Sequence, residues 1–278
     1  MATLLPFHWH IEELLFVGAF WAAHRTFVLN EHQRRLCSWA LIALLVVVVW
    51  PIGDIAASVS LTVATVQRLI IMLLVAPLLL RSIPIQIFSR LTRPKAVDFL
   101  ATKVAHPGVA LLLVTVLGTL TLSTPLVDWG ASSTLGRNVV LLITMLSGFL
   151  LWAPSLAIVP GARRLSPAGR AGFIFVSSLV VTSLSFVWIF SLHSLYPGLH
   201  NQHELLNMTP LFDQQLAGFV AKLGCYLPMW IVAFRIFFHA EDEGVPVEES
   251  PLQWADVERK MLRIDRQRER AIRRHQPD

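Results

Sequence analysis

The sequence has few charged residues and few cysteines for a chain of 278 residues. Only 15% of its residues are charged, and its two cysteines, Cys37 and Cys225, lie in or beside apolar runs. So few cysteines exclude a disulfide framework. A glycine-rich phosphate loop, a CxxC motif and an HExxH motif are all missing. These absences argue against a hydrolase, a kinase or a redox enzyme, and we expect the protein not to be an enzyme.

Apolar residues, by contrast, are abundant. They make up 55% of the chain, and the mean hydropathy is +0.61. This composition is typical of a polytopic membrane protein, in which each helical span needs about 20 mostly apolar residues. We therefore predict an all-α bundle of seven transmembrane helices. The predicted spans are 12–30, 36–52, 59–80, 105–124, 138–159, 171–194 and 212–238.

Basic residues alternate between loops and so predict the orientation of the bundle. The loops 53–58, 125–137 and 195–211 contain a single basic residue, Arg137. The loops on the opposite side contain Arg25, Arg34, Arg35, Arg81, Arg90, Arg93, Lys95, Lys103, Arg163, Arg164 and Arg170. Since cytoplasmic loops carry the excess of Lys and Arg, this pattern predicts an outside N-terminus and an inside C-terminus. The N-terminus lacks the basic region of a signal peptide, so we expect it to be retained.

The last 39 residues differ in composition from the rest. Residues 240–278 carry eight basic and ten acidic groups, a net charge of −2, whereas residues 1–239 carry a net charge of +7. We predict a transmembrane domain at 1–239 and a charged cytoplasmic tail at 240–278. The basic pI of 9.8 therefore reflects membrane loops, and we expect no nucleic-acid partner.

Two segments are predicted to lie at the cytoplasmic surface of the membrane. In the tail, Ser250, Pro251 and Gln253 have the pattern of a helix start, which predicts one amphipathic helix at about 251–274 on the membrane or on a partner. The basic, partly amphipathic segment 84–103 either lies on the membrane lipid or forms an ordinary solvated loop.

Several short motifs occur in a fixed order between about residues 10 and 240. They are Pro51-Ile52-Gly53-Asp54, Val66-Gln67 followed by Leu73-Leu74-Val75-Ala76-Pro77, Gly148 with Trp152-x-Pro154, Leu195-Tyr196-Pro197, and Asp213-Gln214-Gln215-Leu216-Ala217-Gly218. Their order and spacing resemble the multi-pass CtaG-type (caa3) cytochrome c oxidase assembly factors.

The resemblance implies a seven-helix protein of the bacterial plasma membrane that matures a haem-copper oxidase by helping copper to reach it. It implies haem-copper oxidase subunits as partners. It also implies functional or structural roles for Asp54, Gln67, Pro77, Trp152, Tyr196, Pro197, Asp213, Gln214, Gln215 and Gly218.

The sequence departs from the family pattern where copper ligands are expected. The third span of the family typically reads His-Met-x-Gln-His, whereas this chain has Ala64 and Arg68 at the two histidine positions. The family often has histidine before Gly148, but residues 138–147 contain none. Where the family commonly has Met-Trp, this chain has Ala221 and Lys222. Histidine and methionine are the ligands of a membrane copper site, so copper stays a doubtful cofactor.

Arg68 and Lys222 are predicted to lie near the middle of the bilayer, about ten residues inside the third and seventh spans. Charges at this depth are costly and face the protein interior. Two cations in one interior would repel each other, so they would bind an anionic ligand or a partner's acid. The alternative is that they snorkel and pair with Asp213 or Asp54.

Asp213, Gln214 and Gln215 stand at the start of the seventh span. Asp213 is predicted to cap this helix, because an acid is favourable at a helix N-terminus. The two amides point about 100° apart, so at least one should face the bundle and bond another helix, with Gln67 as the candidate partner.

Candidate metal ligands are limited to loop histidines and one sulfur pair. His200 and His203 have metal-ligand spacing, but so do many solvated loop histidines. The same holds for His8, His10 and His193. Cys225 and Met229 share a helix face, with Met72 and Met145 at similar depth, and would suit Cu(I). The alternative is that these sulfur side chains fill the core.

Three functions therefore stay open from the sequence. The first is a CtaG-like assembly factor without direct copper handling. The second is an accessory subunit that stays bound to a respiratory oxidase. The third is a small-molecule or metal carrier, which would need a continuous polar path through its interior.

Overall fold

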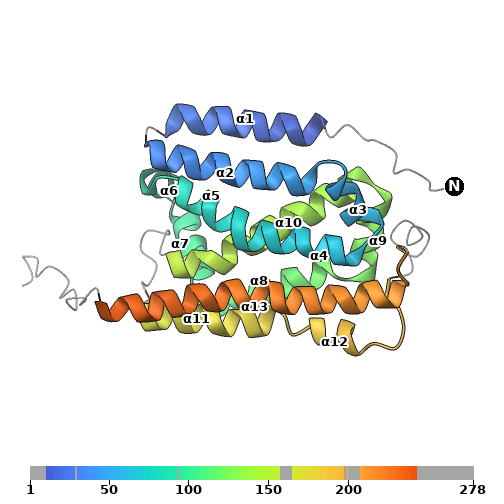
Figure 1. The fold of residues 1–278 in the computed structure, drawn as a ribbon. Coiled ribbons are helices and arrows are strands. Elements are labelled where there is room, and N and C mark those ends of the chain that lie inside the picture. Colours follow the sequence, from blue (N-terminus) through green and yellow to red (C-terminus); the bar gives the residue numbers. More distant parts are fainter. Residues whose placement is uncertain are drawn as a thin grey trace, which may run out of the picture. The chain divides into compact units, whose positions relative to one another are not determined.

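The computed structural model describes residues 11–28, 30–92, 94–156, 165–196, 199 and 207–242. These residues form helices and turns without a strand, which confirms the all-α class over the described ranges (Figure 1). The chain divides into two compact units, Met1–Phe237 and Phe238–Asp278. Of the second unit, the structure describes only the end of one helix. The helix predicted at 251–274 lies outside the described residues.

Within the described ranges, four helices are long and apolar enough to cross a membrane. They are Leu61–Ser82, Thr134–Leu156, Pro167–Phe190 and Pro210–His239. Two further helix pairs meet the same criterion together but are bent at a short break, which gives up to six spans. The first predicted span corresponds to helix α1, Ile11–Phe27, which has only 17 residues. The seven-span count and the orientation therefore stay predictions.

The first bent pair is formed by α2, Glu31–Val48, and α3, Ile52–Ser58, which meet at 54°. The Asn30 side chain caps α2 by accepting a hydrogen bond of 2.9 Å from the His32 N–H. Pro51 follows the end of α2, as expected for a residue that cannot continue a helix. Helices α1 and α2 pack side by side (Figure 1).

The third span is continuous but changes its helical type. It consists of α4 (Leu61–Ile70), the π-helical stretch η1 (Ile71–Val75) and α5 (Ala76–Ser82). The Ser60 side chain caps its start by accepting a hydrogen bond of 3.3 Å from the Val63 N–H. A π-helical turn within an α-helix often marks a functional position.

Short helices follow on both sides of the fourth span. The predicted surface segment 84–103 forms α6 (Ile85–Leu91) and α7 (Lys95–Val104), so an irregular loop is excluded over most of it. A sharp bend of 81° then leads into α8 (Pro107–Thr121). The predicted loop 125–137 contains the helix α9 (Thr124–Ser132).

Helices α10 (Thr134–Leu156) and α11 (Pro167–Val181) pack against α8. Helix α10 contains Pro154. Helices α11 and α12 (Ser185–Phe190) together form one span, and α13 (Pro210–Asp242) forms the last. The main core joins buried residues of α5, α8, α10, α11 and α13, including Ala76, Val114, Leu151, Ile174 and Met229.

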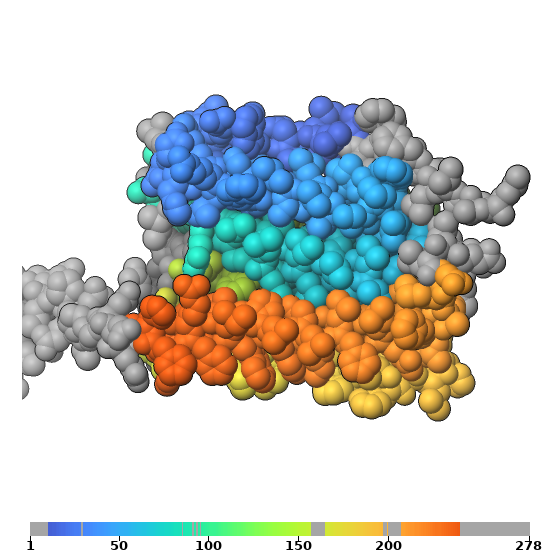
Figure 2. All heavy atoms as spheres, viewed as in Figure 1, coloured from blue at the N-terminus to red at the C-terminus, as the bar shows by residue number. Residues whose placement is uncertain are grey.

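The outward face of α13 is apolar. Phe212, Phe219, Leu223 and Leu227 are each more than half exposed and follow one helical stripe. Figure 2 shows this helix on the surface of the molecule. Because soluble monomers rarely expose such a stripe, this face has the character of a helix that contacts lipid.

Candidate functional site

Asp213 joins the starts of two spans. Its carboxylate accepts hydrogen bonds from Leu61 N (2.7 Å), Thr62 N (3.2 Å) and Ser60 Oγ (2.8 Å), and its side chain is fully buried. It therefore caps α4, where the helix dipole favours a negative charge. The prediction that Asp213 caps its own helix was wrong, because Thr209 fills that role for α13.

Gln214 and Gln215 bind the backbone of the preceding loop. The Gln214 side chain accepts from Leu195 N (2.7 Å) and donates to the His193 carbonyl (3.4 Å). Gln215 donates to the Ser191 carbonyl (3.3 Å). Gln214 does face the bundle, with only 1% exposure. These bonds hold the loop 191–196 against the first turn of α13.

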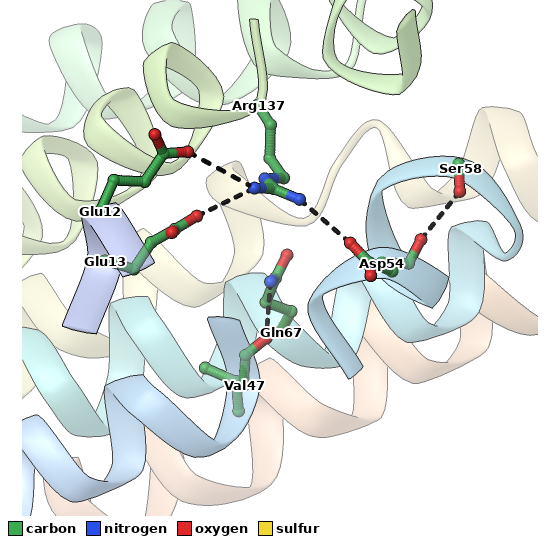
Figure 3. Close-up of polar contacts among 7 residues, drawn as sticks. All are labelled: Glu12, Glu13, Val47, Asp54, Ser58, Gln67 and Arg137. Carbon is green, nitrogen blue, oxygen red and sulfur yellow. Dashed lines mark hydrogen bonds and ion pairs between the residues drawn. The ribbon is translucent and has the colours of Figure 1, made fainter. Parts of the chain in front are cut away.

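Gln67 does not bond Gln214, which corrects the expected pairing. Its amide instead donates to the Val47 carbonyl at 2.7 Å, near the end of α2 (Figure 3). That carbonyl lies in the last turn of α2, where helix carbonyls lack intrahelical donors. Gln67 thus ties α4 to α2.

Tyr196 fixes the same loop to two other elements. Its hydroxyl donates to the Leu122 carbonyl (2.7 Å) and accepts from Trp188 Nε1 (3.0 Å), and the two rings meet edge to face. Burial raises the pKa of the Tyr196 phenol, although the Trp188 bond and the charge of Arg68 act in the opposite direction. The phenol is therefore neutral at physiological pH. The neighbouring motif residue Pro197 lies outside the described residues.

Trp152 completes the hydrogen bonding of the π-helical stretch. Its indole Nε1 donates to the Met72 carbonyl at 2.9 Å. In a π-helical register that carbonyl would accept from residue 77, but Pro77 has no N–H. Gly148 permits the close approach of α10, because a Cβ there would lie 2.7 Å from Ala76 Cβ and 3.0 Å from Met72 Cα. The motif residues of the third and fifth spans thus form one helix junction.

Gly218 permits a second close approach, between α13 and α12. A Cβ at this position would lie 2.7 Å from Ile189 Cγ1 and 2.9 Å from the Ser185 carbonyl. A larger residue would therefore push the two helices apart.

Asp54 belongs to an ion cluster that the sequence did not reveal. Arg137 Nη1 lies 3.0 Å from Asp54, and Arg137 Nη2 lies 2.9 Å from Glu13 and 4.0 Å from Glu12 (Figure 3). We call these four residues the Arg137 cluster. It joins α1, α3 and α10. One feature of the sequence could have indicated this cluster: Arg137 is the single basic residue of the loops predicted to lie outside.

Arg68 lines two cavities. The larger, of about 90 Å³, lies among α4, η1, α8, α10, α11, α12 and α13. The smaller, of about 40 Å³, is also lined by Ala64, Gln67 and Arg137. Arg68 Nη2 donates to the Thr121 carbonyl at 2.7 Å. Its Nη1 is buried and has no hydrogen-bond partner among the described residues.

Lys222 does not share this interior, contrary to the expected repulsion between two cations in one site. It lines neither cavity among the described residues. Its Nζ lies 3.1 Å from the centre of the Phe186 ring and 5.1 Å from that of Tyr226. Cation–π contacts of this kind stabilise a cation without a carboxylate. The predicted pairing with Asp54 or Asp213 is also not found, because Asp54 pairs with Arg137 and Asp213 caps α4.

The described residues fit a copper ion poorly. They contain no group of three or more His, Cys, Asp or Glu side chains that could hold a metal. Cys225 Sγ and Met229 Sδ lie 3.4 Å apart and are buried in the main core. Cys225 also lines the larger cavity, but there it shares the space with the Arg68 guanidinium, which would repel a cation. His8, His10, His200 and His203 lie outside the described residues.

The comparison with protein families identifies the family to which the chain belongs. The model of the cytochrome c oxidase caa3 assembly factor family matches residues 14–241. The searches of curated proteins and of solved structures found no match. The matched region covers the interhelical contacts described above, except for the contributions of Glu12 and Glu13 to the Arg137 cluster. The chain therefore belongs to the cytochrome c oxidase caa3 assembly factor family.

Proposed function

We propose that this protein assists the assembly of a haem-copper cytochrome c oxidase in the bacterial plasma membrane. It acts without catalysing a reaction and without carrying copper itself. The observation that carries the proposal is the family match over residues 14–241. Support comes from the motif residues Asp213, Gln67 and Trp152, because each makes a hydrogen bond between separate helices.

The proposed topology has seven spans, with the N-terminus outside and the C-terminus inside. Helix α1 supplies the seventh span in addition to the four straight and two bent candidates. The distribution of basic residues supports this orientation, since Arg137 is the single basic residue of the proposed outer loops. Residues 240–278 then form a charged cytoplasmic tail.

We infer that the protein does not bind copper directly, because of the side chains that line its two cavities. The positions at which the family has histidine, 64 and 68, both line the smaller cavity, but here they carry Ala64 and Arg68. Ala221, where the family commonly has methionine, lines the larger cavity. A guanidinium between the two cavities opposes the entry of a copper ion. The chain keeps the contacts between helices and changes the side chains they surround.

Metal analysis tests the copper part of the proposal. The full chain is purified in mild detergent from copper-supplemented cells, and its metal content is measured by mass spectrometry. We expect less than about 0.1 copper per chain, because the described residues contain no group of three or more His, Cys, Asp or Glu side chains that could hold a metal. One copper per chain that disappears in Cys225→Ser would contradict this expectation.

Co-purification distinguishes an assembly factor from a resident oxidase subunit. The oxidase is purified through an affinity tag on one of its own subunits, both from growing cells and after synthesis has been stopped. An assembly factor is expected with the first preparation and lost from the second. A constant ratio in both would support the accessory-subunit alternative instead.

A further inference from the structure

Arg68 leaves a positive charge without a counter-charge inside the bundle. Its Nη2 is bonded to the Thr121 carbonyl, but the buried Nη1 has no partner among the described residues. Among the described residues no ion pair joins Arg68 to a carboxylate, and the two predicted partners are used elsewhere: Asp54 pairs with Arg137, and Asp213 caps α4. A buried guanidinium is stable only when a partner compensates the loss of water. The partner must therefore come from outside the described chain.

The larger cavity, which Arg68 lines, offers room for such a partner beside the guanidinium. Several hydroxyl groups line it, but they already donate to carbonyls of their own helices: Thr65 to Leu61, Thr144 to Val140, and Ser147 to Ile143. They therefore cannot neutralise the guanidinium, although their oxygens can accept bonds. Most of the remaining lining is apolar, for example Leu151 and Trp188. In such a medium a charge interacts more strongly with an anion than it would in water.

The size and the charge of the site restrict the chemical class of the partner. A cavity of about 90 Å³ holds a few atoms of the size of water. One unpaired guanidinium balances one negative charge, so a divalent anion such as sulfate would bring an uncompensated charge into the bundle. A monovalent anion with one to four heavy atoms, such as chloride, bromide or formate, fits both limits.

The smaller cavity lies between Arg68 and the Arg137 cluster. Arg68 lines both cavities, and Arg137 lines the smaller one. Arg137 belongs to the cluster near the start of α10, so the smaller cavity extends from this cluster toward Arg68. Arg137 is already compensated by the carboxylates of Glu13 and Asp54. The charge of Arg68 therefore opposes the entry of cations and disfavours the metal-carrier function that the sequence had left open.

We propose that the larger cavity is a binding site for a small monovalent anion, held by the charge of the Arg68 guanidinium. This ligand is additional to the proposed assembly function and does not depend on it. Because the anion neutralises a buried charge, its binding stabilises the folded bundle.

Thermal unfolding in the presence of different anions tests the proposal. The full chain in detergent is unfolded in sodium gluconate, whose anion is too large for the cavity, and gluconate is replaced by chloride or formate at constant ionic strength. We expect the Tm to rise by about 5 °C in a saturable manner. A Tm that is independent of the anion, as expected if water alone fills the cavity, would overturn the proposal.

Matched variants locate the effect. Arg68→Gln should raise the half-saturating chloride concentration by about 10- to 100-fold, because a charge-assisted hydrogen bond is lost. Ala221→Leu, which fills the larger cavity without changing a charge, should have the same effect and covers the case in which Arg68→Gln fails to fold. Lys222→Met removes a cation that lines neither cavity and should leave the chloride dependence unchanged. Equal chloride dependence in all four proteins would contradict the assignment.

Bromide provides a second readout that is independent of stability. Trp188 lines the larger cavity, and bromide quenches indole fluorescence on contact. We expect a saturable component of quenching at low bromide concentration, which is absent in Trp188→Phe and displaced by chloride. Quenching that rises only linearly with bromide would show collisions at the surface and would overturn the proposal.

Discussion

Asp213 connects two spans through a single carboxylate. Its two oxygens accept hydrogen bonds from two backbone N–H groups of α4 and from the Ser60 hydroxyl, while its own backbone belongs to α13. Since the N–H groups at a helix start have no partner within the helix, this carboxylate satisfies α4 and fixes its position against α13 at the same time.

Replacement of Asp213 should therefore destabilise the protein strongly. In Asp213→Ala the buried N–H groups of Leu61 and Thr62 lose their acceptor, and we expect the free energy of unfolding to fall by about 2–4 kcal/mol. Denaturant titration in detergent measures the change. The control is Gln215→Ala, which removes one long hydrogen bond of 3.3 Å and should cost less than about 1 kcal/mol. Equal losses in both variants would be inconsistent with the capping role.

The buried phenol of Tyr196 should make the stability of the protein depend on pH under alkaline conditions. Burial raises the pKa of its phenol above the ordinary value of about 10, so the folded state favours the protonated form. The contribution of Tyr196 is thus fully present below pH 10 and is lost as the pH rises through the raised value. We expect a fall in Tm above pH 10 that is smaller in Tyr196→Phe. An identical pH profile of both proteins would argue against a buried, protonated phenol.

The sequence did not predict the partners of the motif residues. Asp213, Gln67 and Trp152 belong to the family motifs, and each makes a hydrogen bond to another helix. Sequence position alone does not fix the rotation of a helix about its axis, so it could not tell that Lys222 faces Phe186 while Arg68 faces the cavities. It also could not show that Asp213 caps another helix, because that contact joins residues about 150 positions apart.

At the scale of the element, the third span depends on a contact from another helix. The stretch Ile71–Val75 is π-helical, and Pro77 leaves the Met72 carbonyl without its donor. Trp152 of α10 provides that donor. The span and α10 are therefore held in register by one indole N–H and by the absence of a side chain at Gly148.

Removal of the Trp152 indole N–H should weaken the contact between α10 and the third span, while Phe keeps an aromatic ring at this position. In Trp152→Phe the Met72 carbonyl stays unpaired in an apolar environment, which should lower the free energy of unfolding by about 1–3 kcal/mol. Trp129→Phe on α9 is the control, because this side chain is 38% exposed and its loss should have little effect. Comparable destabilisation by both substitutions would count against the proposed role of the indole N–H.

The Arg137 cluster joins α1, α3 and α10 in the same way. Arg137→Gln leaves the carboxylates of Glu13 and Asp54, each 10% exposed, without this cation, and should cost about 2–4 kcal/mol. The surface pair Arg34–Glu31 serves as the control, since Glu31 is 69% exposed and Glu31→Gln should cost less than about 1 kcal/mol. Both values can be measured by denaturant titration, and a neutral Arg137→Gln would refute the role of the cluster in joining these helices.

The helix boundaries were predictable where an apolar run or a proline determines them. Pro51 correctly marked the region in which α2 ends, and the apolar runs coincide with α10 and α13. The bends of 54° and 81° and the short helix α9 were missed, because hydropathy averages over a window and does not register a change of direction. The π-helical stretch was also missed, since hydropathy does not distinguish a π-helix from an α-helix. Gly148 and Trp152 pack against it.

At the scale of the whole molecule, the contacts between helices surround two cavities. The chain belongs to the cytochrome c oxidase caa3 assembly factor family over residues 14–241. Asp213, Gln67 and Trp152 join separate helices, whereas Ala64, Arg68 and Ala221 line the cavities. Substitution of Asp213 should therefore lower stability, and substitution of Arg68 should change anion binding.

The most direct test of the proposed function is the state of the oxidase in a strain that lacks this protein. Membranes of the deletion strain are assayed for cytochrome c oxidase activity, and the purified oxidase is assayed for copper and haem. We predict a loss of assembled, copper-loaded oxidase that is restored by the wild-type chain but not by Asp213→Ala. A deletion strain with a fully copper-loaded, active oxidase at the wild-type level would contradict the assembly function.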